Sequence, residues 1–151
     1  MHEKWLVVAD RVGARIMAVR DGGKTLEARE TFDNPRGRLK DGEIDSDRPG
    51  RAFDSGGEGR HAMSRAESPH ERIGADFARE IGARLAKARG AGEMDELVLV
   101  AEPRFLGQLR DALDEQTAGC VVASVAKDLA QVEAAALGAH LGEALKPAQP
   151  R

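Results

Sequence analysis

Residues 68–101 have the sequence SPHERIGADFAREIGARLAKARGAGEMDELVLVA, which contains the clearest structural signals of the chain. Ser68, Pro69 and Glu71 predict a helix start, because they supply an N-cap, a Pro at the first helical position and the acid of a capping box. Apolar residues then recur at every fourth position and predict one buried stripe along a helix of about five turns. These residues are Ile73, Phe77, Ile81 and Leu85.

After this stripe the sequence alternates between short apolar runs and amphipathic segments. Gly90 and Gly92 end the predicted helix, and the apolar run at residues 97–100 is typical of a buried parallel strand. A helix from Pro103 and a strand at residues 121–125 are predicted to follow. The apolar face of that helix carries Leu106, Leu109 and Leu113. Short links between these elements predict a parallel arrangement with right-handed crossovers.

The last predicted helix begins at Asp128, whose side chain is of the type that caps helices. Its apolar face would carry Leu129, Val132, Ala136, Leu137 and Leu141. Pro147 and Pro150 then predict a frayed tail over residues 147–151.

The N-terminal third predicts three antiparallel strands. Residues 5–9 form a continuous apolar run, as expected of a strand buried on both faces, and residues 10–13 are turn-like. A second strand is predicted at residues 14–19. Asp21-Gly22-Gly23 is a strong hairpin signal, and the alternating pattern of residues 25–32 predicts the third strand.

Together these elements predict one α/β domain over residues 1–146. We expect three layers, with a mixed sheet in which an antiparallel meander is followed by an αβαβα half. The total length of 151 residues suits one domain. A long loop at residues 33–65 separates the two halves.

Composition limits the classes of protein to consider. The formal charge is only −3, and the aromatic content of 3% leaves few side chains for stacking on nucleic-acid bases. The single Cys120 permits no internal disulfide. There is neither a secretory signal nor an apolar stretch of about 20 residues that could span a membrane. These features predict a cytoplasmic protein with no membrane span.

The loop at residues 33–65 is the most informative part of the chain. It contains six glycines, two prolines, seven basic and seven acidic residues, without helix or strand periodicity. Loops of this length inside a domain are either functional or disordered. We expect this loop to be flexible.

Two motifs that suggest ligand sites do not fit their patterns. Gly22-Gly23-Lys24-Thr25 resembles the end of a phosphate-binding loop, but Ala18 stands where a glycine is required and a strand follows, so a hairpin turn is predicted. The acidic run from Asp41 resembles a calcium loop, but Ser46 and Ala52 occupy the positions of its required Gly and Glu.

A metal site assembled by folding is an alternative for the acidic residues of the loop. Its ligands would be Asp45, Asp47, Asp54, Glu58 and His61. The interleaved basic residues favour solvated ion pairs instead. We therefore predict no metal ion and no cofactor.

The loop also holds a cluster of candidate binding residues. Arg48 and Arg51 flank a Pro-Gly turn, which would present two guanidinium groups to a phosphate or carboxylate. The glycine-rich tip lets the backbone approach a partner closely. The full set of binding candidates is Arg48, Arg51, Gly56, Gly57, Glu58, Arg60 and Arg65. The alternative is a solvent-exposed linker.

Candidate catalytic residues are few. Glu58 and His61 could act as general bases, while His70 stands at the predicted helix start. The order of residues singles out no Ser–His–acid or Cys–His arrangement. Cys120 begins an apolar strand and is interpreted as a small core residue.

The order of several motifs resembles the bacterial host attachment protein family over residues 4–142. These motifs are WLVVAD (5–10) with Ala14 and Arg15, FDNP (32–35), SDRPGR (46–51), LVLVA (97–101) with Pro103, Leu106 with Gly107, and VAKDL (125–129). Proteins of this family are described as required for attachment to host cells, which is a phenotype and not a molecular activity.

That family is similar to the middle domain of archaeal and eukaryotic peptide chain release factors, which carries a Gly-Gly-Gln loop between its two halves. The resemblance places Gly56, Gly57 and Glu58 at this loop. A glutamate cannot donate a hydrogen bond as glutamine does, and its charge would repel the phosphates of tRNA. The resemblance therefore implies a role facing the ribosome or RNA, and the change at Glu58 argues against peptidyl-tRNA hydrolysis.

Three functional hypotheses follow. The first is a non-catalytic or weakly catalytic domain that binds the ribosome or structured RNA, with the loop becoming ordered on binding. The second is a hydrolase of an ester or phosphodiester, with Glu58 or His61 as general base and Arg51 or Arg60 stabilising negative charge. The third is a protein-binding adaptor that supports attachment. The sequence predicts no particular oligomeric state.

Overall fold

Five strands form one mixed sheet in the order β3-β2-β1-β4-β5 in the computed structural model, which describes residues 3–39 and 68–146. The strands are β1 Lys4–Ala9, β2 Gly13–Arg20, β3 Thr25–Asp33, β4 Glu96–Ala101 and β5 Val121–Ala126. The α-helices are α3 Pro69–Gly90, α4 Pro103–Ala112, α5 Glu115–Ala118 and α6 Ala134–Leu141. Short 3₁₀ helices are η1 Asp21–Gly23, η2 Pro35–Arg38 and η4 Gly142–Leu145.

Strand β1 lies at the centre of the sheet and joins its two halves. It pairs antiparallel with β2 and parallel with β4, and β5 continues the parallel half. Trp5 pairs with Ala18 on one side and with Leu97 on the other. The predicted meander and the predicted strand–helix–strand half are both confirmed.

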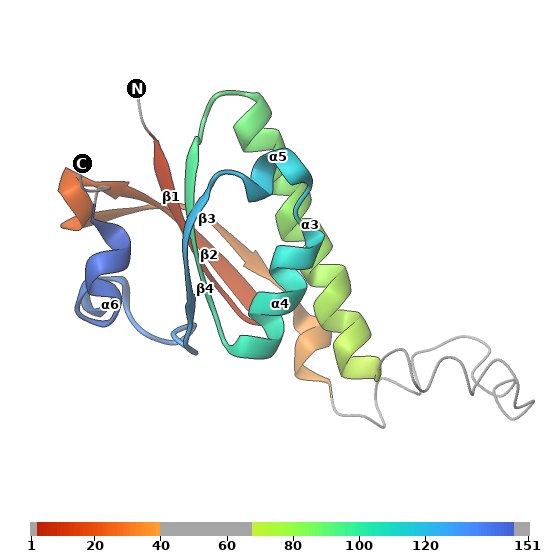
Figure 1. Cartoon of the computed structure of the whole chain (residues 1–151). Helices are drawn as coiled ribbons and strands as arrows, with labels where there is room; N and C mark the ends of the chain where they lie inside the picture. Colours follow the sequence, from red (N-terminus) through yellow and green to blue (C-terminus); the bar gives the residue numbers. More distant parts are fainter. Residues whose placement is uncertain (1–2, 40–67, 147–151) are drawn as a thin grey trace, which may run out of the picture.

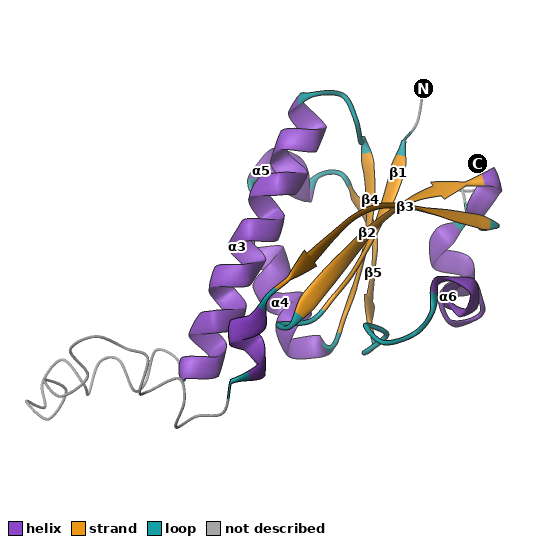
Figure 2. Cartoon of the chain, turned by 180° about the vertical axis from the view of Figure 1, so that it is seen from behind, coloured by secondary structure: helices purple, strands orange, loops and turns teal. Residues whose placement is uncertain are grey.

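The helices cover both faces of the sheet, so the predicted three-layer α/β arrangement is confirmed. Helices α3, α4 and α5 lie on one face, whereas α6 lies on the other (Figures 1 and 2). One apolar cluster joins the first face to α3 and α4, and includes Trp5, Phe77 and Phe105. A second cluster joins the opposite face to α6 and η4, and includes Leu6, Val98 and Leu137.

The start of α3 has the predicted capping box. The backbone N–H of Glu71 donates to Ser68 Oγ at 3.1 Å, and the backbone N–H of Ser68 donates to Glu71 Oε1 at 3.3 Å. The four residues of the predicted stripe, Ile73, Phe77, Ile81 and Leu85, are all buried. The local sequence therefore sets both the first residue of α3 and the face that it buries.

Close packing of α3 against α4 depends on a glycine. A Cβ atom at Gly82 would lie 2.8 Å from the carbonyl oxygen of Ala112, closer than such contacts occur. The absence of a side chain thus lets the two backbones approach each other. The two helices lie side by side and start at the same end of the sheet (Figures 1 and 2).

The hairpin between β2 and β3 confirms the turn predicted at Asp21-Gly22-Gly23. These three residues have φ angles of 54°, 66° and 101°, in the left-handed region that glycine tolerates best. Lys24 follows this turn and β3 begins at Thr25. No α-helix begins here, in agreement with the prediction of a hairpin instead of a phosphate-binding loop.

The prediction that Asp128 caps the last helix is wrong. Helix α6 begins only at Ala134, with Glu133 at the N-cap position. The carbonyl oxygen of Leu129 instead accepts hydrogen bonds from Val132 N at 3.0 Å and from Arg15 Nη2 at 3.0 Å. The long-range hydrogen bond from Arg15 helps to hold the segment before α6 in a turn. Leu129 is nevertheless buried, so this apolar residue packs into the core without being part of a helix.

Within the described ranges, no helix is both long and apolar enough to span a membrane.

Helix α5, between α4 and β5, was not predicted from the sequence. Asp114 caps this short helix, with the backbone N–H of Thr117 donating to Asp114 Oδ1 at 2.7 Å.

Candidate functional site

The carboxyl ends of β1, β4 and β5 and the starts of α3 and α4 lie at one edge of the molecule, which we call the carboxyl edge (Figure 1). Asp10 and Glu102 directly follow β1 and β4, and Asp128 follows β5. In open α/β sheets, ligands bind outside the carboxyl ends of parallel strands. A ligand site is therefore expected at this edge.

A hollow of about 390 Å³ lies at the carboxyl edge, between the strand ends and the helix starts. Its lining comes from the β1–β2 turn, the first turns of α3 and α4, and the segment after β5. The lining residues are Asp10, Arg11, Val12, His70, Glu71, Glu102, Arg104, Phe105, Gln108 and Asp128. A smaller hollow of about 170 Å³ shares Asp10 and Val12 with it and also includes Arg15.

Three of the acidic residues at this edge are bound to backbone N–H groups. Asp10 Oδ1 accepts from Val12 N at 2.8 Å and from Gly13 N at 3.0 Å. The Glu102 carboxylate caps α4 and accepts from Phe105 N at 2.7 Å, while Glu71 completes the capping box of α3. Carboxylates at helix starts are compensated by the positive end of the helix dipole. These three carboxylates thus help to fix the β1–β2 turn and the starts of α3 and α4.

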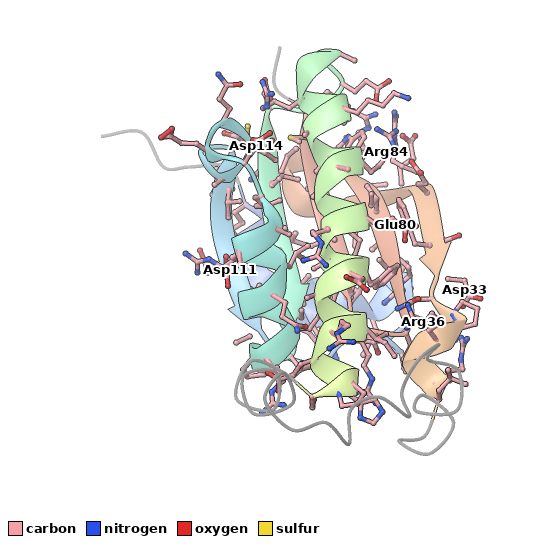
Figure 3. The ribbon with its side chains drawn as sticks, turned by 90° about the vertical axis from the view of Figure 1, so that its right-hand side faces the viewer. Asp33, Arg36, Glu80, Arg84, Asp111 and Asp114 are labelled. Atoms are coloured by element: carbon pink, nitrogen blue, oxygen red, sulfur yellow. The ribbon has the colours of Figure 1, made fainter. Side chains whose placement is uncertain are left out.

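Five arginines from four separate elements lie at the same edge, and we call them the arginine collar. They are Arg11 in the β1–β2 turn, Arg36 and Arg38 in η2, Arg72 in the first turn of α3, and Arg104 in the first turn of α4. Figure 3 shows Arg36 and Asp33 at the end of the molecule where α3 begins.

The arginines of the collar differ in how far their guanidinium groups are already bound. Arg11 Nε donates to the carbonyl oxygen of Gly37 at 3.0 Å, and Arg38 pairs with Asp33 at 3.0 Å. Arg36 and Arg104 are exposed and have no side-chain partner among residues 3–39 and 68–146. Three of the neighbouring carboxylates, by contrast, already accept hydrogen bonds from backbone N–H groups.

Helix η2 is held firmly against the β1–β2 turn. Asn34 N donates to the carbonyl oxygen of Val12 at 2.8 Å, and Asn34 Nδ2 donates to that of Arg11 at 2.7 Å. A Cβ at Gly37 would overlap the carbonyl oxygen of Arg11 and lie 2.8 Å from its carbonyl carbon. Only glycine therefore allows η2 to approach the turn this closely.

The two ends of the segment at residues 40–67 are both attached to the carboxyl edge. Leu39 precedes this segment, and its carbonyl oxygen accepts from His70 Nε2 at 3.0 Å. A carbonyl oxygen can only accept, so Nε2 of His70 carries a proton. His70 also lines the larger hollow. The segment is thus inserted at the arginine collar.

The binding candidates from the sequence all lie outside the described residues. These are Arg48, Arg51, Gly56, Gly57, Glu58, Arg60 and Arg65, together with the catalytic candidate His61 and the acidic residues Asp45, Asp47 and Asp54. Among the residues that are described, no three His, Cys, Asp or Glu side chains form a group that could hold a metal ion.

The structure adds residues that sequence reasoning missed. Arg11 and Arg104 each follow the end of a strand by two or three residues, and Arg36 and Arg38 flank Gly37. An arginine soon after a buried strand is the signal that could have found the first two.

Cys120 is half-buried and packs at the margin of the first cluster, with its Sγ 3.6 Å from the Gln116 carbonyl oxygen.

Arg15 lies between the smaller hollow and the core. Its Nη2 donates to Leu129, its Nε is buried without a hydrogen-bond partner among the described residues, and burial lowers the pKa of its guanidinium. Arg15 remains charged at neutral pH, because the pKa of arginine starts far above that range. Its role is to hold the segment that follows β5, which carries Asp128.

Comparisons with known proteins identify both sequence and fold relatives. A family model described as "Protein required for attachment to host cells" matches residues 5–141. No curated protein sequence gives a significant match.

Among solved structures, the crystal structure of an archaeal translation termination factor, aRF1, matches with a TM-score of 0.51 and 11% identity. This match covers 95% of this chain and 36% of that protein. A structure described only as an archaeal protein matches with a TM-score of 0.48 and 13% identity, covering 95% and 35% of the two chains. The chain thus spans about a third of the length of these structures, and the first likeness confirms a release-factor-like fold.

Proposed function

The chain belongs to the family of proteins required for attachment to host cells, and from this premise we propose that it is a release-factor-like domain that binds structured RNA, including that of the ribosome. The observation that carries the proposal is the arginine collar at the carboxyl edge. The collar combines exposed guanidinium groups with carboxylates that are already bound to backbone N–H groups.

Arginine suits this partner because its planar guanidinium group binds phosphate through two parallel hydrogen bonds. Contacts to phosphate supply most of the sequence-independent affinity of proteins for nucleic acids. The overall charge of −3 does not attract RNA. Exposed guanidinium groups at one edge, such as those of Arg36 and Arg104, would orient the domain on the RNA with this edge foremost.

The likeness of fold supports a partner in the translation apparatus. The structure that matches with a TM-score of 0.51 is a translation termination factor. A domain of the same fold could bind the translation apparatus without catalysing the reaction of a termination factor. This function would operate in the cytoplasm, and we propose that its effect on attachment is indirect, through protein synthesis.

The segment at residues 40–67 is proposed to extend the binding surface. It is inserted at the collar, between Leu39 and Ser68. We propose that Arg48, Arg51, Arg60 and Arg65 add phosphate contacts and that the backbone at Gly56 and Gly57 approaches the RNA closely. Glu58 would face the RNA without catalysing hydrolysis.

The test compares arginines at the two ends of one helix. Arg104 lies in the first turn of α4 and Arg110 near its end; both are exposed. Binding to a structured ribosomal RNA fragment is measured over a range of salt concentrations, together with co-sedimentation with ribosomes. We expect Arg36→Ala with Arg104→Ala to weaken binding and to reduce the salt slope by about 0.7–0.9 for each phosphate that is no longer neutralised. Arg110→Ala should bind as the wild type does.

Three outcomes would contradict this proposal. These are no association at low salt, equal weakening by the collar variants and by Arg110→Ala, and binding that does not depend on salt. An assay of peptidyl-tRNA hydrolysis on the same samples, with Glu58→Gln for comparison, addresses the hydrolase hypothesis. Turnover by the wild type would favour an enzyme, whereas capture of a protein partner without RNA would favour an adaptor.

A further inference from the structure

We propose that the larger hollow of the carboxyl edge accepts a single unpaired guanine nucleotide of the bound RNA, with Asp128 recognising the base. This inference rests on the proposed function and names the feature of the RNA that the site would select. The Asp128 carboxylate lines the hollow and has no partner in the described part of the chain.

Asp128 differs from the other acidic residues around the hollow. Asp10, Glu71 and Glu102 each accept hydrogen bonds from backbone N–H groups. Asp128 is exposed, and within the described ranges its carboxylate has no hydrogen bond or ion pair. Both of its oxygens are therefore available to a ligand.

The position of Asp128 is set by long-range contacts. Arg15 Nη2 holds the carbonyl oxygen of the next residue, Leu129, and the Leu129 side chain is buried in the second cluster. The residue beside Asp128 is thus anchored through both its backbone and its side chain, although no helix begins there. A carboxylate on an anchored segment loses less conformational freedom when it binds a ligand.

The hollow has the size of a site for one nucleotide, and its lining includes two arginines and four carboxylates. Its volume of about 390 Å³ falls within the range of roughly 300–1,000 Å³ found for small-molecule sites. Arg11 and Arg104 line it with guanidinium groups that can donate to a phosphate, and Gln108 contributes an amide. Phe105 is only 2% exposed, so base recognition here would depend on hydrogen bonds and on the planar faces of the arginines.

The chemistry of the carboxylate selects among the bases. Guanine presents two neighbouring N–H donors on its Watson–Crick edge, at N1 and N2, which match the two oxygens of a carboxylate. Adenine, cytosine and uracil present donors next to acceptors, and an acceptor would face one carboxylate oxygen unfavourably. Because a paired guanine has this edge occupied, the site would select an unpaired nucleotide.

Calorimetric titration of the full chain with GMP, AMP, CMP, UMP and inorganic phosphate tests this site. We expect GMP to bind about tenfold more tightly than the other nucleotides, in line with the discrimination of a bidentate pair. Asp128→Asn should remove this preference. Asp111→Asn removes the same charge from an exposed position farther along α4 (Figure 3) and should retain the preference.

The inference is overturned if the four nucleotides bind equally, if phosphate alone binds as tightly as GMP, or if Asp128→Asn keeps the preference for GMP. Binding of the structured RNA is measured on the same variants. RNA binding that still depends on Arg104 while GMP does not bind would refute the nucleotide site and leave the proposed function standing. Absence of both RNA binding and GMP binding would refute both proposals. Circular dichroism of Asp128→Asn confirms that the fold is retained.

Discussion

His70 Nε2 donates a hydrogen bond of 3.0 Å to the carbonyl oxygen of Leu39, and this bond joins two residues that flank the segment at residues 40–67. His70 lies in the first turn of α3, and Leu39 follows η2. The folded core therefore holds both ends of the segment at one place.

We expect the core to fold without this segment. Residues 40–67 number 28, and replacing them with a Gly/Ser linker of about seven residues halves the loop length twice. Each halving lowers the entropic cost of loop closure by about 0.6 kcal/mol, so the shortened chain should be more stable by about 1 kcal/mol. Urea denaturation at equilibrium measures the change. A large decrease in stability would show that the segment contributes contacts to the core.

Replacement of Gly37 by alanine should destabilise the carboxyl edge. The added Cβ would lie 2.8 Å from the carbonyl carbon of Arg11 and 3.1 Å from the Cα of Val12, both of which are backbone atoms. Overpacking of this kind costs about 1–3 kcal/mol. The control is Gly107→Ala in α4, where a Cβ meets no atom within 4 Å.

The two glycine variants should shift stability in opposite directions. Alanine is a better helix former than glycine by about 1 kcal/mol, so Gly107→Ala should stabilise the protein slightly. The midpoints of thermal unfolding distinguish the two cases. Equal midpoints for both variants would contradict the close packing of η2 against the β1–β2 turn.

Removal of the N-cap of α3 should cost about 1 kcal/mol. Ser68→Ala leaves the backbone N–H of Glu71 without its acceptor, whereas Ser68→Asp retains an acceptor at the same position. Ser124→Ala changes an exposed serine of β5 and should alter stability by less than about 0.5 kcal/mol. Urea denaturation of the three variants gives the comparison, and equal stability of Ser68→Ala and the wild type would contradict the capping box.

The cap of α5 should make stability depend on acid pH. Hydrogen bonds from the backbone N–H and then the side chain of Thr117, with a smaller effect of Arg89, hold the pKa of Asp114 below its usual value. In the unfolded chain the pKa of aspartate returns to about 3.9. The unfolded state therefore takes up the proton first as the pH falls.

The stability that ionised Asp114 contributes is fully present above the unfolded pKa and is lost as the pH falls through the folded pKa. Asp114→Asn keeps a side-chain oxygen at the cap but does not titrate. We expect the difference in free energy of unfolding between the wild type and Asp114→Asn to shrink as the pH falls below the unfolded pKa of about 3.9. A difference that stays constant as the pH falls would show that the cap does not perturb Asp114.

Local patterns were sufficient to predict most of the secondary structure. Ser68 and Glu71 are three residues apart, and the capping box that they form involves only those two residues and their backbone. The stripe from Ile73 to Leu85 similarly follows from the period of the helix. Such signals succeed because the interacting groups are close in sequence, so that the chain around them matters little.

The start of the last helix could not be predicted in this way. Asp128 has the chemistry of an N-cap, but the carbonyl oxygen of the next residue is bound by Arg15, which is 114 residues away in sequence. That hydrogen bond and the burial of Leu129 hold the backbone in a turn. A local preference of about 1 kcal/mol is smaller than the combined effect of these tertiary contacts.

The sequence by itself determined the mixed α/β fold and the succession of its main strands and helices, because apolar periodicity and helix caps act over a few residues. Only the tertiary structure brought Arg11, Arg36 and Arg104 to one edge and placed Asp128 there, with no partner among the described residues. These residues come from different elements, and no short-range pattern relates them. They lie close together because the parallel strands end at this edge of the sheet and helices α3 and α4 begin there.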